Sequence, residues 1–431
     1  MLTAMSIESQ HQHEESITPF ARTDFRHRRD VFGIKKKDRR NHMYVIGQTG
    51  TGKSTMLSNM VIADIQRGEG VALIDPHGDL AENILNFVPD ARMEEVIVFN
   101  PGDMRYPIAF NPLEQVDPDN HFLVVSGLIS VFRKIWPDAW GPRLEHILRN
   151  TLFALLTYEG STLLDIPRLL TDKKFRTEVL KNVKDQHLRD FWYLEFEQTP
   201  PQFRTTTIAP ILNKTSQFVA SLPLRYVVGQ RESAFDLRKI MDEGKILIVN
   251  LSKGKIGEDN CALLGALLVN KLMLAAMSRS DLPEEQRRPF YLYVDEVHNF
   301  LTLAFADILS ESRKYGLNLI LAHQYIDQLE PEIRSAIFGN VGTTISFRVG
   351  VDDAAVMANE FYPMFEKGDL IGLPNHHIYL KMMIDGMTCR PFSAITLPPP
   401  EIGRSCKGEI IEFSRMKYGR PRHEAGRIAP R

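Results

Sequence analysis

The chain has 431 residues, which is enough for two or three domains with a substantial core. Hydrophobic residues make up 43% and charged residues 25%, a soluble composition that excludes collagen-like, disordered and disulfide-scaffold classes. The net charge of −2 excludes a protein that is basic throughout and coats nucleic acid over its whole face.

The charge is distributed unevenly along the chain. Residues 1–40 carry nine Lys or Arg against six Asp or Glu, and residues 401–431 carry eight against four, so the residues between them are net acidic. Nucleic acid would therefore be held through local patches or by a few cations that line a pore.

The sequence predicts a cytoplasmic protein. Its start lacks the basic segment and apolar core of a secretory signal. The longest apolar stretches, such as Ala262–Val269, break at Asn270 and Lys271, short of the about 20 residues of a membrane span, so we expect no transmembrane segment. Three widely spaced cysteines are typical of free thiols in a reducing compartment. Any recruitment to a membrane would then need a partner.

Strand and helix patterns alternate on both sides of a long helical segment, which predicts an α/β fold with a mainly parallel sheet. The helical segment has apolar residues at helical spacing, namely Leu144, Ile147, Leu148, Thr151, Leu152 and Leu155. The expected strands are His42–Gln48, Gly70–Asp75, Glu95–Phe99, Lys245–Leu251, Tyr291–Val294, Leu317–Ala322, Thr343–Arg348 and Ile378–Ile384. The expected helices outside the insertion are Lys53–Gln66, Ala262–Met277 and Phe305–Tyr315.

Five segments follow from these patterns. A basic, partly disordered arm at 1–40 and a basic tail at 401–431 flank the folded body. Residues 41–112 and 236–400 form the two parts of the sheet domain, and residues 113–235 form an all-α insertion.

The strongest motif lies between the first strand and the first helix. It matches G-x-x-x-x-G-K-[ST], in which backbone N–H groups and a helix N-terminus surround phosphates. Lys53 would reach the β- and γ-phosphates, and the Ser54 hydroxyl would bind Mg²⁺. A chance glycine-rich turn is disfavoured, because this motif follows a strand and opens a helix. The nucleotide-binding residues are Gly47, Gln48, Thr49, Gly50, Thr51, Gly52, Lys53, Ser54 and Thr55.

Two acids follow the strand Tyr291–Val294. A P-loop needs a carboxylate at a second strand end, so Asp295 is expected on the Mg²⁺ side and Glu296 as the general base. The alternative is a strand that ends in two solvated acids. Because simple GTPases lack the second acid, Glu296 favours an ATPase.

Two further candidates come from the next strand and the helix before it. Gln324 follows the strand Leu317–Ala322, at the edge of the sheet where the P-loop is expected. There its side chain either touches the γ-phosphate or the attacking water, or only caps the end of the strand. Arg313 lies eleven residues upstream. From the residues alone, Arg313 is equally a solvated helix-end cation or an arginine finger for a neighbouring subunit.

Several motifs together resemble a known family. GQTGTGKST, IDPHGD (Ile74–Asp79), YPIAFNPL (Tyr106–Leu113), YVDE and RKYGLNLILAHQ, in this order, resemble the HerA/FtsK superfamily of RecA-like DNA-pumping ATPases. The helical insertion most resembles the conjugative coupling proteins of type IV secretion, of the TraD type. The resemblance covers roughly residues 32–397 in scattered blocks.

The resemblance implies a RecA-like P-loop domain in a hexameric ring, with DNA in the channel and ATP with Mg²⁺ between subunits. It implies that Gln324 is the sensor glutamine and that Arg313 is the finger acting in trans. A relaxase or other secretion components are the implied partners.

The remaining motifs leave alternatives open. Asp75–Asp79 is favoured as turn chemistry over an element near the nucleotide. The tryptophans of the insertion are favoured as core over partner contacts. His11, His13, His376 and His377 lack further ligands at metal-binding spacing. The segment 22–40 has nine cations with Phe25 and Phe32 interleaved, which suits DNA contact or an arm packed on a neighbouring subunit.

The leading functional hypothesis is an ATP-driven motor that moves DNA without sequence preference, since phosphate contacts carry no sequence information. One alternative is an ATPase that energises protein secretion, and another is a HerA-like DNA-processing helicase. A third is a docking platform for which nucleotide is only an assembly switch.

Overall fold

The structure is a computed structural model that describes residues 16–24, 26, 28–114 and 117–425. The chain divides into two compact units. The first contains the described residues up to Val98 together with 238–250 and 275–413, and the second contains 99–237, 251–274 and the described residues from Ser414 on. These limits differ from the predicted domain limits at 112 and 235, which remain a prediction.

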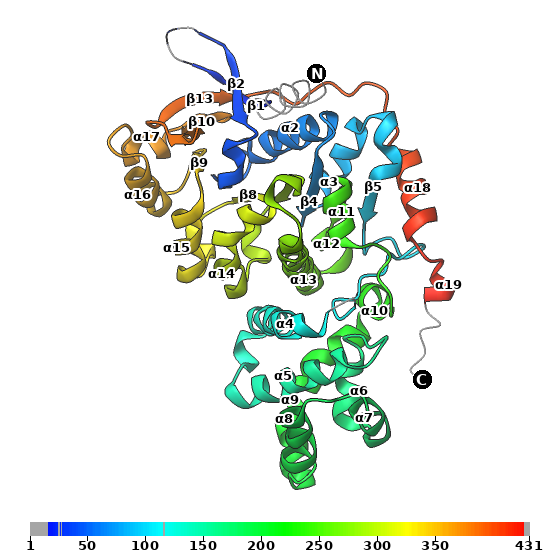
Figure 1. Cartoon of the computed structure of the whole chain (residues 1–431). Helices are drawn as coiled ribbons and strands as arrows, with labels where there is room; N and C mark the ends of the chain where they lie inside the picture. Colours follow the sequence, from blue (N-terminus) through cyan, green and yellow to red (C-terminus); the bar gives the residue numbers. More distant parts are fainter. Residues whose placement is uncertain (1–15, 25, 27, 115–116, 426–431) are drawn as a thin grey trace. The chain divides into compact units, whose positions relative to one another are not determined.

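The first unit is built on one sheet of eleven strands among the described residues, in the order β2-β1-β13-β10-β9-β3-β8-β7-β4-β6-β5 (Figure 1). Pairing from β9 through β6 is parallel, and pairing from β2 to β9 is antiparallel. The strands are β1 (Ile17–Thr23), β2 (Val31–Lys35), β3 (Met43–Ile46), β4 (Gly70–Asp75), β5 (Val96–Phe99), β6 (Ile246–Asn250), β7 (Phe290–Val294), β8 (Leu317–His323), β9 (Thr343–Ser346), β10 (His377–Lys381) and β13 (Phe392–Thr396).

Every strand that the sequence predicts is present, with ends shifted by a few residues at most, and the α/β fold is confirmed. The last predicted strand ends at Lys381, and a short hairpin of β11 (Met383–Ile384) and β12 (Met387–Thr388) turns at Asp385–Gly386. Further helices of this unit are α3 (Asp79–Ile84), α11 (Leu237–Glu243), α14 (Leu303–Ser312), α15 (Pro331–Asn340), α16 (Val351–Glu360) and α17 (Lys367–Ile371).

Helix α2 (Lys53–Gln66) has the predicted limits and carries the P-loop at its N-terminus. Its apolar stripe of Leu57, Met60, Val61 and Ile65, which are spaced as on one face of a helix, is fully buried in the core beside the sheet. The opposite face is covered as well, because the Asn59 side chain donates to the carbonyls of Leu397 and Pro398.

The segment predicted as an arm is partly folded into the sheet. β1 pairs with β13 on one side and with β2 on the other, and the ladder is irregular between Pro19 and Ala21. Proline has no N–H for a regular ladder, so it is confined to edges and bulges. Pro19 therefore hid this strand from the sequence pattern. Phe25, which the sequence places among the cations of this segment, lies outside the described residues.

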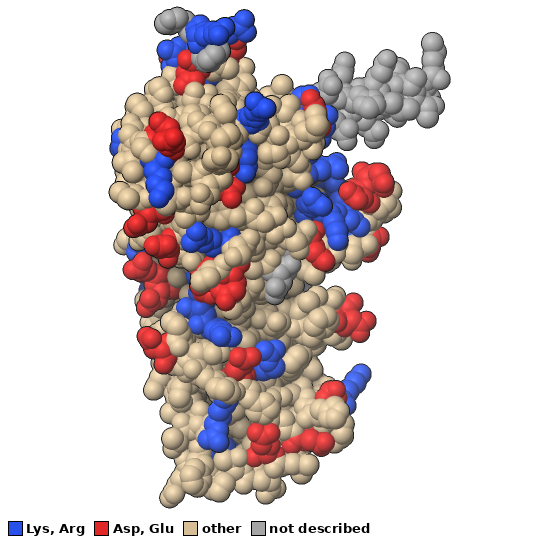
Figure 2. All heavy atoms as spheres, turned by 90° about the vertical axis from the view of Figure 1, so that its left-hand side faces the viewer, with Lys and Arg blue, Asp and Glu red and all other residues tan. Residues whose placement is uncertain are grey.

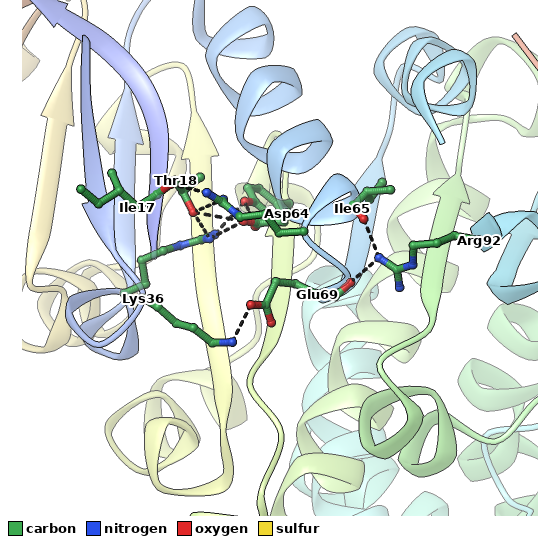
Figure 3. A network of polar contacts seen from close by, with 10 residues as sticks. Ile17, Thr18, Lys36, Asp64, Ile65, Glu69 and Arg92 are labelled. Carbon is green, nitrogen blue, oxygen red and sulfur yellow. Dashed lines mark hydrogen bonds and ion pairs between the residues drawn. The ribbon is translucent and has the colours of Figure 1, made fainter. Parts of the chain in front are cut away.

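A buried ionic network joins this hairpin to α2 and β7 (Figure 3). Arg39 donates to Asp64 at 2.7 Å, and both side chains are 1% exposed. Thr18 and Tyr293 also donate to the Asp64 carboxylate. Burial by itself would lower the pKa of Arg39, but Asp64 and the two tyrosines of β7 raise the pKa by more than burial lowers it. The net effect is a raised pKa, so the Arg39 guanidinium stays charged. The network fixes α2 against the strand that ends at the two acids.

The second unit contains the predicted all-α region. Its helices are α4 (His121–Ile135), α5 (Pro142–Leu156), α6 (Asp165–Thr171), α7 (Lys173–Leu180), α8 (Gln186–Asp190), α9 (Pro201–Ala220), α10 (Leu222–Val228), α12 (Lys253–Ile256), most of α13 (Glu258–Met277) and α19 (Arg422–Ala425), and α18 (Lys407–Tyr418) connects to it. The six residues of the predicted α5 stripe are all buried. Trp136 and Trp192 are core residues, whereas half-buried Trp140 donates to Glu145 at 3.1 Å.

One helical stretch of the described chain, Glu258–Asp281, is long and apolar enough to cross a membrane by length and composition. In the structure, 67% of the most apolar part of this stretch is buried. The core helices of soluble proteins can be equally long and apolar. The polar residues Asn270 and Lys271 interrupt the apolar sequence of this stretch, but the helix continues through them. Lys271 keeps its ammonium paired there by donating to the carbonyls of Pro112 and Glu114.

Candidate functional site

The loop between β3 and α2 adopts a conformation that only its glycines permit. Gly50 and Gly52 have φ of +77° and +118°, in the left-handed region that L side chains rarely adopt. Between them, the Thr51 hydroxyl donates to the Gln48 carbonyl at 2.7 Å and closes the loop. The loop therefore wraps around the N-terminus of α2, where successive backbone N–H groups can face an anion.

Both neighbouring strands hold this loop at its beginning. The Gly47 N–H donates to the carbonyl of His323 at the end of β8, and the Gln48 N–H donates to the carbonyl of Arg348 after β9. The start of the P-loop is thus fixed by the parallel sheet itself.

Lys53 is buried, with 6% of its surface exposed. Its ammonium donates to the carbonyls of Gly47 and Gln48 at 2.5 and 3.2 Å. Burial lowers the pKa of Lys53, and the nearby carboxylates of Glu296 and Asp295 oppose that shift. The cation is therefore placed between the P-loop backbone and the two acids.

Asp295 ends β7 and is almost fully buried, with 4% of its surface exposed. Its N–H donates to the Ile74 carbonyl of β4 at 3.1 Å, which continues the parallel ladder to the end of the strand. Burial, then the like charges of Glu296 and Asp75, raise the pKa of Asp295 to about 6, although Lys53 acts in the opposite direction. Such a carboxyl group gains most from a nearby cation.

Glu296 is held in a strained conformation beside Asp295. Its φ of +47° and ψ of 51° place a non-glycine residue in the left-handed region, at a cost on the order of 1–3 kcal/mol. Its Oε1 accepts a hydrogen bond from the Gln324 amide at 2.7 Å. Among the described residues, its buried Oε2 accepts no hydrogen bond, and the Nδ1 of His298 lies 3.5 Å away. The structure thus brings Glu296 and Gln324 together, as the parallel strand ends predict.

The hydroxyl residues of the motif differ in exposure. Ser54 is exposed at the start of α2, Thr49 is exposed, and Thr55 is half-buried. A cavity of about 410 Å³ adjoins the loop and is lined by Gln48, Thr49, Gln324, Tyr325, Asp327, Gly350, Val351, Asp352 and Asp353. Space for a ligand therefore lies next to the P-loop and Gln324.

Arg313 is not brought to this site. It lies at the end of α14, is exposed, and donates to the Asn41 side chain at 3.3 Å. Asn41 precedes β3, whereas the P-loop follows β3. Arg313 therefore lies at the opposite edge of the sheet from the P-loop of its own chain.

Sequence reasoning missed several residues at the site. Arg348 follows β9 and donates through Nε to the Gln48 side chain at 3.4 Å. His298, two residues after Glu296, contacts the carboxylate, and its position next to the two acids was the available signal. His323, the last residue of β8, is buried against the Tyr44 hydroxyl, and burial lowers its pKa to about 3.

Asp75, at the end of β4, makes the hydrogen bonds of the turn that the sequence predicts. Asp75 accepts hydrogen bonds from the N–H groups of His77 and Ala81, at 2.8 and 2.9 Å, which is the favoured turn and helix-start chemistry. The same carboxylate also raises the pKa of Asp295. The described residues contain no cluster of three or more His, Cys, Asp or Glu suited to a metal ion. His11 and His13 lie outside them.

The fold and this site define a RecA-like P-loop protein. The chain belongs to a family of conjugation proteins: residues 30–362 match the family described as the type IV secretion-system coupling protein DNA-binding domain. The resemblance to coupling proteins found in the sequence is thereby confirmed. A comparison with curated proteins finds no match.

Solved structures share the fold. The unbound monoclinic form of the bacterial conjugative coupling protein TrwBdeltaN70 is similar with a TM-score of 0.64 and 16% identity, over 92% of each chain. The plasmid coupling protein TrwB in complex with ADP and Mg²⁺ has a TM-score of 0.62 and 18% identity, over 86% of this chain and 89% of that one. VirB4 of Thermoanaerobacter pseudethanolicus has a TM-score of 0.57 and 13% identity, over 91% and 98%.

Proposed function

We propose that this protein is a coupling ATPase that hydrolyses ATP to move DNA without sequence preference through a ring of subunits in type IV secretion or conjugation. The observation that carries the proposal is the convergence of Lys53, Asp295, Glu296 and Gln324 at one sheet edge in a chain of the coupling-protein family.

The residues present fit a Mg²⁺–nucleotide. The left-handed glycines leave the start of α2 open to phosphate, and the buried Oε2 of Glu296 accepts no hydrogen bond from the described residues. Ser54 and Asp295 would hold Mg²⁺ with hard oxygen ligands, and residues 47–55 would hold the phosphates. A solved TrwB structure in complex with ADP and Mg²⁺ supports the same pairing here. Bound Mg²⁺ supplies neutralisation of the charge on the phosphate oxygens.

The protein groups around the phosphates have distinct proposed roles. Lys53 exchanges the carbonyls of Gly47 and Gln48 for phosphate oxygens, which needs only a swing of its own side chain. Glu296 accepts a proton at Oε2 from the attacking water, and its αL backbone aims that oxygen. Gln324 holds the Glu296 carboxylate in place through its 2.7 Å hydrogen bond to Oε1, and it responds to whether a γ-phosphate is bound beside it.

We propose that the basic segment contacts DNA through the turn between β1 and β2. The turn between β1 and β2 carries the exposed cations Arg26, Arg28 and Arg29. Figure 2 shows Lys and Arg side chains gathered at the top of the view, the height at which Figure 1 draws this turn. Such a patch binds a phosphate backbone without reading its sequence.

The test is the ATPase rate of the full chain with and without single- and double-stranded DNA, with the oligomer mass measured in the presence of nucleotide. We expect a nucleotide-dependent ring whose turnover rises with DNA. Lys53→Ala should abolish hydrolysis, because it removes the cation on the transferring phosphoryl group. The exposed Lys367→Ala variant is the matched control and should hydrolyse ATP normally.

Each alternative predicts a different result. An ATPase that energises protein secretion would turn over without DNA stimulation, and a docking platform would bind nucleotide without multiple turnovers. Wild-type hydrolysis by purified Lys53→Ala protein would contradict the P-loop assignment itself.

A further inference from the structure

A loop far along the sequence returns to the P-loop. β10 runs antiparallel to β9, with Tyr379 opposite Ser346, and β9 runs parallel to β3. The start of β10 therefore lies at the same sheet edge as the P-loop. Residues 372–376, between α17 and β10, border the nucleotide site proposed above.

His376 is fixed against the P-loop through its backbone. Its N–H donates to the Thr51 carbonyl at 2.8 Å, and its carbonyl accepts bonds from the N–H and the hydroxyl of Thr396 at 2.8 and 3.2 Å. These bonds hold His376 at a φ of +66°, in the left-handed region. A strained residue persists only where its surroundings hold it, and such residues cluster at ligand sites.

The imidazole of His376 lies over the N-terminus of α2. A Cβ added to Gly52 would lie only 2.8 Å from its Nδ1. The residue is exposed, and within the part of the chain that the structure describes its ring nitrogens make no hydrogen bond. Arg348 ties the same loop to the P-loop from the other side, by donating to the Leu373 carbonyl and the Gln48 side chain.

The sheet order sets the direction of a bound nucleotide. β3, which leads into the P-loop, lies between β8 and β9. The groups proposed for the terminal phosphate, Gln324 and Glu296, follow β8 and β7 on one side, whereas His376 and Arg348 lie at β10 and β9 on the other. A nucleoside triphosphate with its γ-phosphate at Glu296 and its other phosphates on the P-loop would place its nucleoside on the side of β9 and β10.

We propose that the His376 imidazole binds the nucleoside part of the triphosphate, its ribose and base, and not the phosphates. This inference rests on the proposed function, since it places the phosphates at Lys53. The ring can stack on a base or form a hydrogen bond with a ribose hydroxyl. Because the backbone of His376 is fixed by its hydrogen bonds, the residue is preorganised for the ligand.

The experiment compares the affinities of the full-length protein for Mg²⁺–ATP and for Mg²⁺–tripolyphosphate, which lacks a nucleoside. The main variant is His376→Gly, because glycine adopts φ of +66° freely and keeps the backbone bonds to Thr51 and Thr396. His377→Ala, one residue further into β10, is the matched control. Lys53→Ala reports on the phosphate site.

We expect His376→Gly to weaken ATP binding by roughly 3- to 10-fold, within the range of one neutral hydrogen bond, and to leave tripolyphosphate affinity unchanged. His377→Ala should bind both ligands like the wild type. Unchanged ATP affinity in His376→Gly overturns the inference. An equal loss for both ligands also overturns it, because a residue that only shapes the P-loop would act on the phosphates.

The failure of the proposed function would look different. If the wild type binds neither ligand, or if Lys53→Ala binds both as tightly as the wild type, the phosphate site is wrong and the inference falls with it. If Lys53→Ala weakens both ligands while His376→Gly weakens neither, only the nucleoside contact is refuted.

Discussion

Replacing Asp295 by Asn should make the nucleotide-free protein more stable at neutral pH. The buried carboxylate lies beside Glu296 and Asp75, and these surroundings raise its pKa from an ordinary 3.8 to about 6. Asparagine has nearly the same shape, and its side-chain oxygen can still accept the Glu296 N–H that Asp295 Oδ1 accepts at 3.0 Å. The substitution therefore removes the buried charge with little change in packing.

The magnitude follows from the pKa change. Raising the pKa of the Asp295 carboxyl from 3.8 to about 6 corresponds to about 3 kcal/mol, because each tenfold change in an equilibrium constant is worth about 1.4 kcal/mol. A carboxyl group with a raised pKa binds more protons in the folded chain, so the free energy of unfolding falls as the pH rises from about 4 to about 6. The gain from Asp295→Asn should thus be about 3 kcal/mol at pH 7.5 and only about 1 kcal/mol at pH 4.5.

The assay is urea denaturation of the full chain without nucleotide at these two pH values. Glu285→Gln removes an exposed carboxylate in the short helix Glu284–Gln286 and should give no comparable gain. A stability of Asp295→Asn at pH 7.5 equal to or below that of the wild type would refute the reasoning. So would a gain that does not shrink toward pH 4.5.

Three further predictions follow from the site, the network and the hairpin. Glu296→Gln should retain Mg²⁺–ATP binding but lose on the order of 10²–10⁴ in turnover, the range for a general base; normal steady-state hydrolysis would make Glu296 an ordinary strand-end acid. Asp64→Asn should lower the free energy of unfolding by about 3–5 kcal/mol, because it leaves a buried guanidinium without its carboxylate; urea denaturation measures this, and a loss below about 1 kcal/mol counts against it. Replacing Arg26, Arg28 and Arg29 together by Ala should weaken DNA binding most at low salt and reduce the slope of log K against log salt by up to about 3; an unchanged slope would mean that the turn does not contact DNA.

The parallel part of the sheet was predictable because its signals are local. Each buried strand is a short apolar run, and the P-loop and the apolar stripe of helix α2 both lie within the one stretch of residues 47–66. Parallel strand ends meet at one edge, so Asp295, Glu296 and Gln324 could be expected near the P-loop before any contact was known.

The antiparallel part was harder, because its evidence is distant in sequence. Pro19 and the irregular register obscured β1, and its partner β13 lies more than 360 residues away. His376 reaches the P-loop only because β10 reverses direction beside β9, whereas Arg348 simply follows β9, which runs parallel to β3. No spacing rule in a single sequence reports that reversal. In the sequence, His376 therefore has no signal beyond its neighbour His377, a pair that raises only the question of a metal ligand.

The position of Arg313 turns an open alternative into a sharp test. Asn41, its hydrogen-bond partner, precedes β3, and Gly47 follows it, so about 20 Å of extended chain separate the two sheet edges at about 3.3 Å per residue. Arg313 therefore cannot serve the P-loop of its own chain, and any role at a nucleotide must be in a neighbouring subunit.

If Arg313 is such a finger, Arg313→Ala should bind ATP but lose about 10³–10⁵ in turnover. Lys53→Ala should be inactive as well. In a mixed ring, a Lys53→Ala subunit still offers Arg313 to a neighbour whose P-loop is intact, so mixing the two inactive variants should restore part of the activity. Subunit exchange is verified by co-purification of two tags. Confirmed exchange with no recovered hydrolysis would leave Arg313 as a solvated helix-end cation.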